Sequence, residues 1–248
     1  MLEETRRWKA ARPARGQTWD VGIVALSLAT VAVALFFWNS PFLLPVKMFV
    51  VLLHEMSHGL AAVLTGGEVE QLRLLSDEGG LALTRGGNRF LILSAGYLGS
   101  ALWGAALLRL AWAGPSMRRF ALRAMGVALA LVTVLYVRDL TTLAYVALAT
   151  LAVFAIGLLG GARLQMAVLW LVGTFSCLYA VIDIGTDILL AGPLAGIPLI
   201  GGPARLNDAE MLADVTFIPA FFWGLLWSGV AVGIYLLALM RLATRKGR

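Results

Sequence analysis

The sequence is poor in cysteine, histidine and charge: its 248 residues include one cysteine, two histidines and only 14% charged side chains. The single cysteine, Cys177, excludes an internal disulfide and zinc sites built from paired cysteines. Soluble domains carry about 25% charged residues, so the low fraction argues against an ordinary soluble domain. The net charge of +6 does not indicate nucleic-acid binding, because the basic residues cluster at the chain ends and in short loops, as they do in membrane proteins.

Long hydrophobic runs are what the sequence has instead. Hydrophobic residues make up 60% of the chain, and several runs reach the roughly 20 residues that cross a bilayer as a helix. We therefore predict an all-α fold, a polytopic helical membrane protein with six or seven transmembrane helices. The seven runs cover residues 21–38, 46–65, 90–112, 120–137, 141–159, 164–190 and 218–240. Before the last run, residues 191–216 are rich in Gly and Pro and are expected to form a loop.

The rest of the chain is polar and short. We expect residues 1–20 to be a basic cytoplasmic tail, residues 21–240 to be a single membrane-embedded domain, and residues 241–248 to be a second basic tail. Residues 68–89 are polar, with leucines among charges and with the Gly79-Gly80 pair that hairpin turns favour. We predict a small β-hairpin there, after the second helix, with an ordinary loop as the alternative.

The orientation in the membrane is predicted by the Lys and Arg residues near the ends of the runs. With seven crossings the two sides hold equal numbers, which favours neither orientation. If residues 120–159 cross only once, with part of them re-entrant, both basic tails share one side and the count favours that side as cytoplasmic. We therefore expect the N-terminus in the cytoplasm.

Both histidines lie in the second run, in the motif His54-Glu55-Met56-Ser57-His58. On a helix, residues i and i+4 share one face, so the two imidazoles can point at one ion. This is the H-E-x-x-H pattern of zinc metalloproteases, in which the glutamate is the general base. The alternative is two histidines packed on an apolar helix. Ionisable groups at membrane depth are costly, which favours a functional role for His54, Glu55 and His58.

Catalytic zinc usually takes three protein ligands, and the chain has no third histidine. A carboxylate is the expected third ligand. We predict Asp183, with Asp187 as the alternative, because both lie in an apolar run where an unpaired carboxylate is expensive. Asp208 ranks third, because its surroundings are loop-like and a helix cap is its more ordinary role.

Four segments in order are HEMSHGLAA, SAGYLGSALWG, YAVIDIGTDILL and NDAEMLADVTFIPAFFWGLLW. This order resembles the peptidase M50B-like branch of the site-2 protease family of intramembrane zinc metalloproteases, over roughly residues 40–235. The family usually supplies its third ligand from a Leu-Asp-Gly motif preceded by an Asn-Pro pair. This chain has Ile182-Asp183-Ile184-Gly185 without that pair, and Gly96-Tyr97 where the family often has Gly-Pro.

The motif and the resemblance together predict a metalloprotease-like domain in residues 21–240 that cuts in or near transmembrane segments. Zn²⁺ would bind His54, His58 and Asp183, or Asp187, with Glu55 as the catalytic base. The expected partners are a membrane-protein substrate helix and the lipid bilayer, with no nucleic acid. The resemblance implies a multi-pass protein of the bacterial cell membrane. The alternatives are a non-catalytic zinc-binding membrane protein and, last, a metal transporter, which should show several ligand clusters and often internal repeats.

Overall fold

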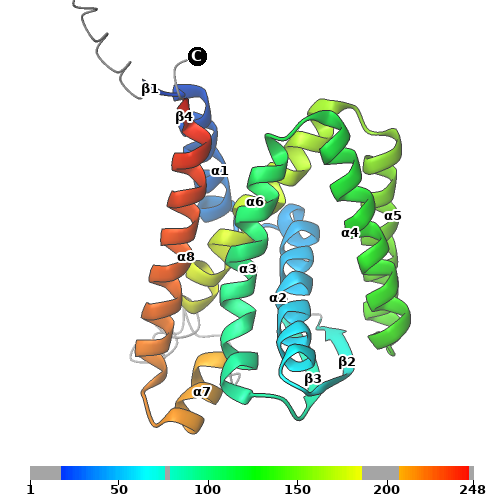
Figure 1. Ribbon diagram of the computed structural model, residues 1–248, viewed down its shortest axis with the longest axis vertical. Coiled ribbons are helices and arrows are strands. Elements are labelled where there is room, and N and C mark those ends of the chain that lie inside the picture. Colours follow the sequence, from blue (N-terminus) through cyan, green and yellow to red (C-terminus); the bar gives the residue numbers. More distant parts are fainter. Residues whose placement is uncertain (1–17, 76–78, 186–206, 246–248) are drawn as a thin grey trace, which may run out of the picture.

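The computed structural model describes residues 18–75, 79–185 and 207–245 of the chain. This part is helical almost throughout, with one short strand at each end and one β-hairpin (Figure 1). The helices are α1 (Val21–Phe37), α2 (Leu44–Leu64), α3 (Arg89–Ala111), α4 (Pro115–Tyr136), α5 (Leu140–Leu159), α6 (Ala162–Ile184), α7 (Asp208–Thr216) and α8 (Ala220–Ala243), and a 3-10 turn, η1 (Pro41–Leu43), precedes α2. The strands are β1 (Thr18–Trp19), β2 (Glu68–Leu74), β3 (Gly80–Arg85) and β4 (Thr244–Arg245). The predicted helical fold with a small hairpin is confirmed.

Six helices in the described residues are long and apolar enough to cross a membrane, which is the lower of the two predicted numbers. They are α2 together with η1, then α3, α4, α5, α6 and α8. The first run forms α1, whose 17 residues extend about 25 Å and fall short of a hydrocarbon core of roughly 30 Å. The chain is therefore an integral, multi-pass membrane protein.

Both ends of the described chain lie at one end of the bundle. Strand β1 pairs with β4, with Thr18 opposite Arg245, and Figure 1 shows this pair beside the start of α1 and the end of α8. The re-entrant alternative for residues 120–159 is wrong, because α4 and α5 are two full-length helices that pack side by side. An even number of spans, six, brings the two ends of the described chain together instead.

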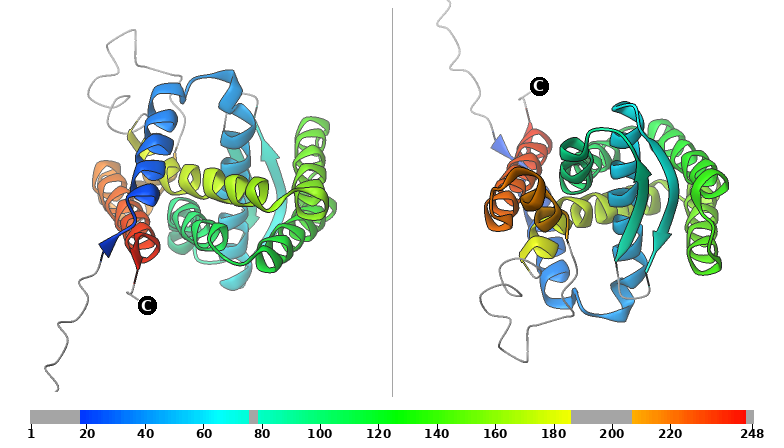
Figure 2. Two further views of the ribbon diagram at one scale, coloured as in Figure 1. Left: turned by 90° about the horizontal axis from the view of Figure 1, so that it is seen from above. Right: turned by 90° about the horizontal axis from the view of Figure 1, so that it is seen from below.

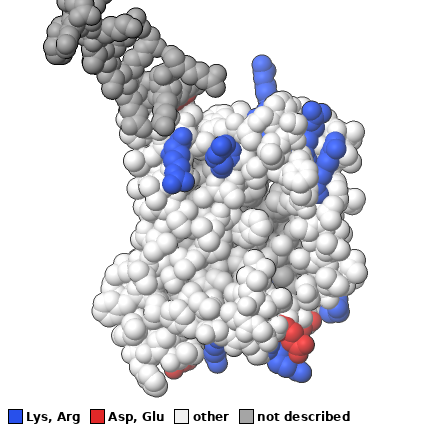
Figure 3. All heavy atoms as spheres, viewed as in Figure 1, with Lys and Arg blue, Asp and Glu red and all other residues white. Residues whose placement is uncertain are grey.

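Arginines concentrate at the end of the bundle where the described chain begins and ends. Figure 3 shows Lys and Arg side chains gathered there, above a broad band without charge. This end, termed the basic end, holds Arg109, Arg118, Arg119, Arg123, Arg163 and Arg241. The opposite end, which carries the hairpin and α7, holds Arg73, Arg85, Arg89 and Arg138. The positive-inside rule thus predicts that the basic end faces the cytoplasm.

Helix α3 lies at the centre and packs against α2, α6 and α8 (Figures 1 and 2). Its glycines allow the close contact, as small residues do between membrane helices. A Cβ on Gly99 would lie 2.5 Å from the Cβ of Ser57 on α2. A Cβ on Gly104 would lie 2.6 Å from the carbonyl oxygen of Gly173 on α6. The glycine-rich third run therefore brings α3 against the helix that carries both histidines.

The predicted hairpin is present, and the ordinary-loop alternative is wrong. Strands β2 and β3 pair antiparallel, with an irregularity in register between Val69 and Gln71. Leu72 and Leu74 on β2 are buried, and the Leu74 N–H donates to the Thr142 hydroxyl of α5 at 2.9 Å. The hairpin therefore lies against the membrane bundle and packs along α2.

The expected loop at residues 191–216 is wrong in its last part, where the chain forms α7. Asn207 caps this helix, since its side chain accepts from the Glu210 N–H at 2.9 Å. The Glu210 carboxylate accepts from the Asn207 N–H at 3.1 Å, which completes a capping box. Helix α7 packs against α3 and α8 at the hairpin end of the bundle (Figure 1).

Candidate metal centre

The centre begins on α2, where helical geometry puts both histidines on one face. His54 and His58 are buried, with 5% and 6% of their surfaces exposed. Their Nε2 atoms lie 3.0 Å apart. The convergence that the i, i+4 spacing predicts is therefore present, and both nitrogens can bind the same ion.

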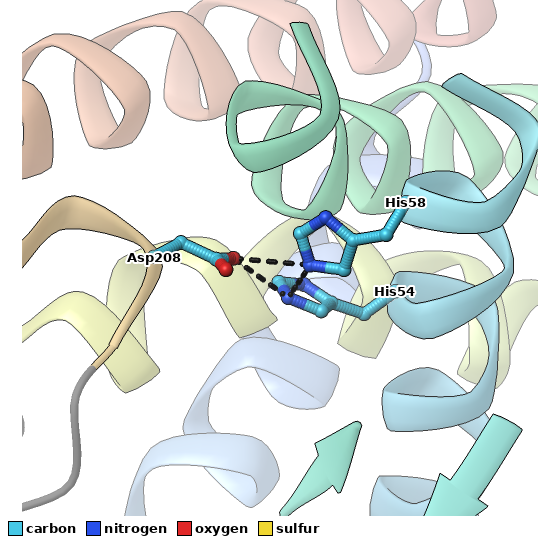
Figure 4. Close-up of side chains that lie close together, drawn as sticks. All are labelled: His54, His58 and Asp208. Atoms are coloured by element: carbon cyan, nitrogen blue, oxygen red, sulfur yellow. Dashed lines mark hydrogen bonds and ion pairs between the residues drawn. The ribbon is translucent and has the colours of Figure 1, made fainter. Parts of the chain in front are cut away.

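The third side chain comes from α7. The Asp208 Oδ2 atom lies 3.1 Å from Nε2 of His54 and 3.1 Å from Nε2 of His58. Figure 4 shows this carboxylate pointing at the two imidazoles from the opposite side of the site. Among the residues that the structure describes, these three form the group of His, Cys, Asp and Glu side chains that could hold a metal ion.

The geometry of the three side chains fits zinc. Tetrahedral ligands at bond lengths of about 2.0–2.1 Å lie about 3.3 Å from one another. The three candidate atoms lie 3.0–3.1 Å apart, so small side-chain shifts would accommodate the ion. Two imidazole nitrogens and one carboxylate oxygen form the kind of three-ligand set that leaves a fourth position open in catalytic zinc sites.

A hydrogen-bond partner orients the second nitrogen of each imidazole. The His58 Nδ1–H donates to the Ile92 carbonyl at 2.7 Å. The His54 Nδ1 atom lies 3.4 Å from the Ser100 hydroxyl oxygen, and that hydroxyl donates to the Gly96 carbonyl at 2.9 Å, so its oxygen can accept the His54 proton. Both rings can thus carry their proton on Nδ1, which leaves the Nε2 lone pairs for a metal.

Sequence reasoning places Asp208 third among the candidate ligands, because it expects Asp208 to cap a helix. In the structure Asn207 is the cap. Asp208 follows the cap, is only 8% exposed, and points its side chain at the histidines. Burial alone would raise the pKa of Asp208, but the nearby His58 and His54 outweigh burial and hold that pKa well below its ordinary value. The Asn-x-x-Glu spacing of the capping box was the sequence signal that could have assigned the cap correctly.

Asp183, the predicted third ligand, lies near the end of α6 and outside the group of three. Its Oδ2 atom accepts a hydrogen bond from the Tyr97 hydroxyl at 2.8 Å. Asp183 therefore has a buried polar partner and does not need a metal to offset the cost of lying in an apolar helix. The geometry favours Asp208 in its place, and Asp187, the alternative, lies outside the described residues.

Glu55, the predicted base, is buried beside the group, with 6% of its surface exposed. Its carboxylate interacts electrostatically with His58 and Asp208, and the backbone of Ala82 on β3 is within hydrogen-bonding reach. Strand β3 lies so close that a Cβ on Gly80 would collide with the carboxylate. The hairpin thus covers Glu55 with backbone, and a side chain at position 80 would require Glu55 to move.

Gly96 on α3 lies against both imidazoles. A Cβ at this position would lie 2.5 Å from His54 Nε2 and 2.5 Å from His58 Cε1. Contacts under 3.0 Å force a shift, and here the neighbours are the candidate ligands themselves. Tyr97, the next residue, places its ring edge-on to His54, with 4.9 Å between the ring centroids.

We therefore expect Gly96→Ala to displace the imidazoles, lower the bound zinc to well below one ion per chain, and destabilise the fold by about 1–3 kcal/mol, as overpacking does. Metal analysis and thermal unfolding of the purified protein would measure both effects. Gly229→Ala on α8 is the matched control, because a Cβ there meets nothing within 4 Å. Equal zinc content in the two variants would contradict the proposed contact.

Comparison with known families adds one finding. A model of the Peptidase M50B-like family matches residues 27–238. The match includes α2, α3 and α7 and therefore all three candidate ligands and Glu55. No curated protein and no solved structure matches the chain significantly.

Proposed function

The chain belongs to the Peptidase M50B-like family, and on this premise we propose that it is an intramembrane zinc metalloprotease that hydrolyses peptide bonds in or near transmembrane segments of membrane proteins. The observation that carries the proposal is the meeting of His54, His58 and Asp208 within a bundle of apolar helices. The family supports a membrane metallopeptidase of the site-2 protease type. The geometry adds which residues would do the chemistry.

His54 and His58 would hold the ion through Nε2, and Asp208 through one carboxylate oxygen. When bound, zinc supplies Lewis acidity, which polarises a substrate carbonyl and makes water a nucleophile at neutral pH. Glu55 is buried and is not one of the three ligands, so its carboxylate remains available for protons. It accepts the proton of the attacking water and passes it to the leaving amine.

The substrate has to be extended where it is cut, because a regular helix engages its peptide groups in its own hydrogen bonds. His58 lies six residues before the end of α2, which is about 9 Å along the helix axis. The site therefore lies toward the membrane face that carries the hairpin. A transmembrane helix unwound near this face would fit the site.

Two other functions were compatible with the sequence. A metal transporter should have several ligand clusters along a path, whereas the part of the chain described by the structure has one group of three. This difference favours hydrolysis over transport. A non-catalytic zinc protein would use the same three ligands and would need no base at position 55, so an activity measurement separates it from a protease.

Removing the metal should abolish cleavage, and returning zinc should restore it. Without zinc, the proposed mechanism has no group that polarises the substrate carbonyl and activates the water. The test uses purified protein in detergent with a panel of single-span reporter proteins, followed by blotting for fragments before chelation, after chelation and after zinc return. We expect about one zinc per chain and loss of fragments on chelation.

A His54→Ala/His58→Ala double variant is the control, and it should stay zinc-free and inactive after zinc return. Cleavage that survives complete removal of the metal would contradict the proposal. One zinc per chain with no cleavage of any reporter would favour the non-catalytic function.

A further inference from the structure

A groove between α3 and α8 at the basic end is separate from the metal centre. It has a volume of about 360 Å³ and is lined by two arginines and by small or aliphatic side chains. Arg109 and Ala105 come from α3, while Leu242, Arg241, Ala238, Leu237 and Ile234 come from α8. None of these residues takes part in the proposed reaction.

Both arginines lie toward one end of the groove, beside Leu242, and the lining toward the other end is wholly apolar. Helices α3 and α8 both begin at the hairpin end and finish at the basic end (Figure 1). Arg109 lies one turn above Ala105, and Arg241 lies two turns above Ile234. At 1.5 Å per residue, the apolar part reaches about 10 Å below Arg241. Ala105 and Ala238 are the small side chains that leave the space open.

Both guanidinium groups are available to a ligand. Arg109 and Arg241 are exposed, lie in the last turns of their helices, and line one hollow. In residues 18–75, 79–185 and 207–245, no carboxylate forms an ion pair with either of them. Two like charges beside one hollow favour an anion between them, and guanidinium groups bind phosphate oxygens strongly.

We propose that this groove binds one anionic phospholipid, with its phosphate between Arg109 and Arg241 and one acyl chain along Ala105, Ala238 and Ile234. Basic pockets between transmembrane helices are suited to such headgroups. The uncharged band of the surface lies directly below the basic side chains over these two helices (Figure 3). The apolar wall is what selects a lipid over a free phosphate ion, because an ion alone would leave that wall exposed.

The test is native mass spectrometry of the full-length protein released from nanodiscs of phosphatidylcholine that contain a minor fraction of phosphatidylglycerol with the same acyl chains. We expect one phosphatidylglycerol to remain on each wild-type chain, in preference to phosphatidylcholine. Arg109→Gln/Arg241→Gln should weaken its retention roughly 30-fold, as expected when two basic side chains near a membrane surface are lost. Ala238→Phe keeps both charges but fills the groove, so it should also lose the lipid.

The matched control is Arg119→Gln/Arg163→Gln, which removes the same charge from exposed positions of the basic end outside the groove. This control should retain phosphatidylglycerol as the wild type does. Equal loss in the control would replace the site with a diffuse attraction, and equal retention of phosphatidylcholine would remove headgroup recognition; either result overturns the proposal. Displacement by inorganic phosphate would also overturn it, because the acyl chain would then contribute nothing. Ala105→Phe repeats the filling test from α3, and an unchanged unfolding temperature shows that each variant is folded.

Discussion

Glu55→Gln is expected to keep the fold and about one zinc per chain while it lowers the rate of peptide cleavage by about 10²–10⁴-fold. The amide has nearly the same shape as the carboxylate but cannot accept the proton of the attacking water. Zinc should stay because the three side chains that could hold the ion do not include Glu55. The measurement compares zinc content, thermal unfolding and the rate of fragment formation from a reporter that the wild type cuts.

Glu70→Gln is the matched control for this variant, since it makes the same change on the exposed hairpin. Glu70 forms an ion pair with Arg85 at 2.6 Å, and exposed pairs contribute little to stability. The control should therefore cleave at the wild-type rate. If Glu55→Gln also cleaved at that rate, the role of Glu55 as a base would be refuted, whereas loss of zinc in Glu55→Gln would show that the residue supports the metal site itself.

The sequence was sufficient for the parts of the protein that depend on local patterns. Hydrophobic runs of bilayer length predicted the spans, because a membrane helix has to satisfy its backbone internally. The His54 and His58 spacing predicted convergence, since both lie on one helix and its geometry is fixed. The polar segment with Gly79-Gly80 predicted the hairpin. In each case the relevant residues are neighbours along the chain.

The parts that sequence reasoning did not find depend on contacts between distant elements. Asp183 seemed to lack a partner because nothing in its own run could provide one, yet Tyr97 of α3 donates to it. The sequence did not predict the burial of Asp208, because its neighbours along the chain are polar. That burial results from the packing of α7 against α3 and α8. The number of spans is six because α1 is too short to be counted as one. The hydrophobic run alone did not show where that helix ends.

The proposal that Asp208, and not Asp183, is the third ligand gives a second prediction with a large expected effect. Asp208→Asn should weaken zinc binding by more than about 100-fold, since loss of a ligand should exceed the 10–100-fold effect of losing an outer-shell partner. Asp183→Asn should retain about one zinc per chain, because the carboxamide oxygen can still accept from the Tyr97 hydroxyl. Metal analysis after dialysis against a zinc buffer would measure both variants.

Thermal unfolding separates loss of a ligand from loss of the fold. A ligand that binds only the folded state raises stability by an amount that grows with its concentration, so zinc should raise the unfolding temperature of the wild type and of Asp183→Asn, but not of Asp208→Asn. Asn207→Ala provides an intermediate case, because it keeps the carboxylate of Asp208 while losing a helix cap worth about 1 kcal/mol. It should bind zinc more weakly than the wild type and more tightly than Asp208→Asn. Greater loss of zinc from Asp183→Asn than from Asp208→Asn would return the third ligand to α6, and it would mean that α7 contacts the histidines without holding the metal.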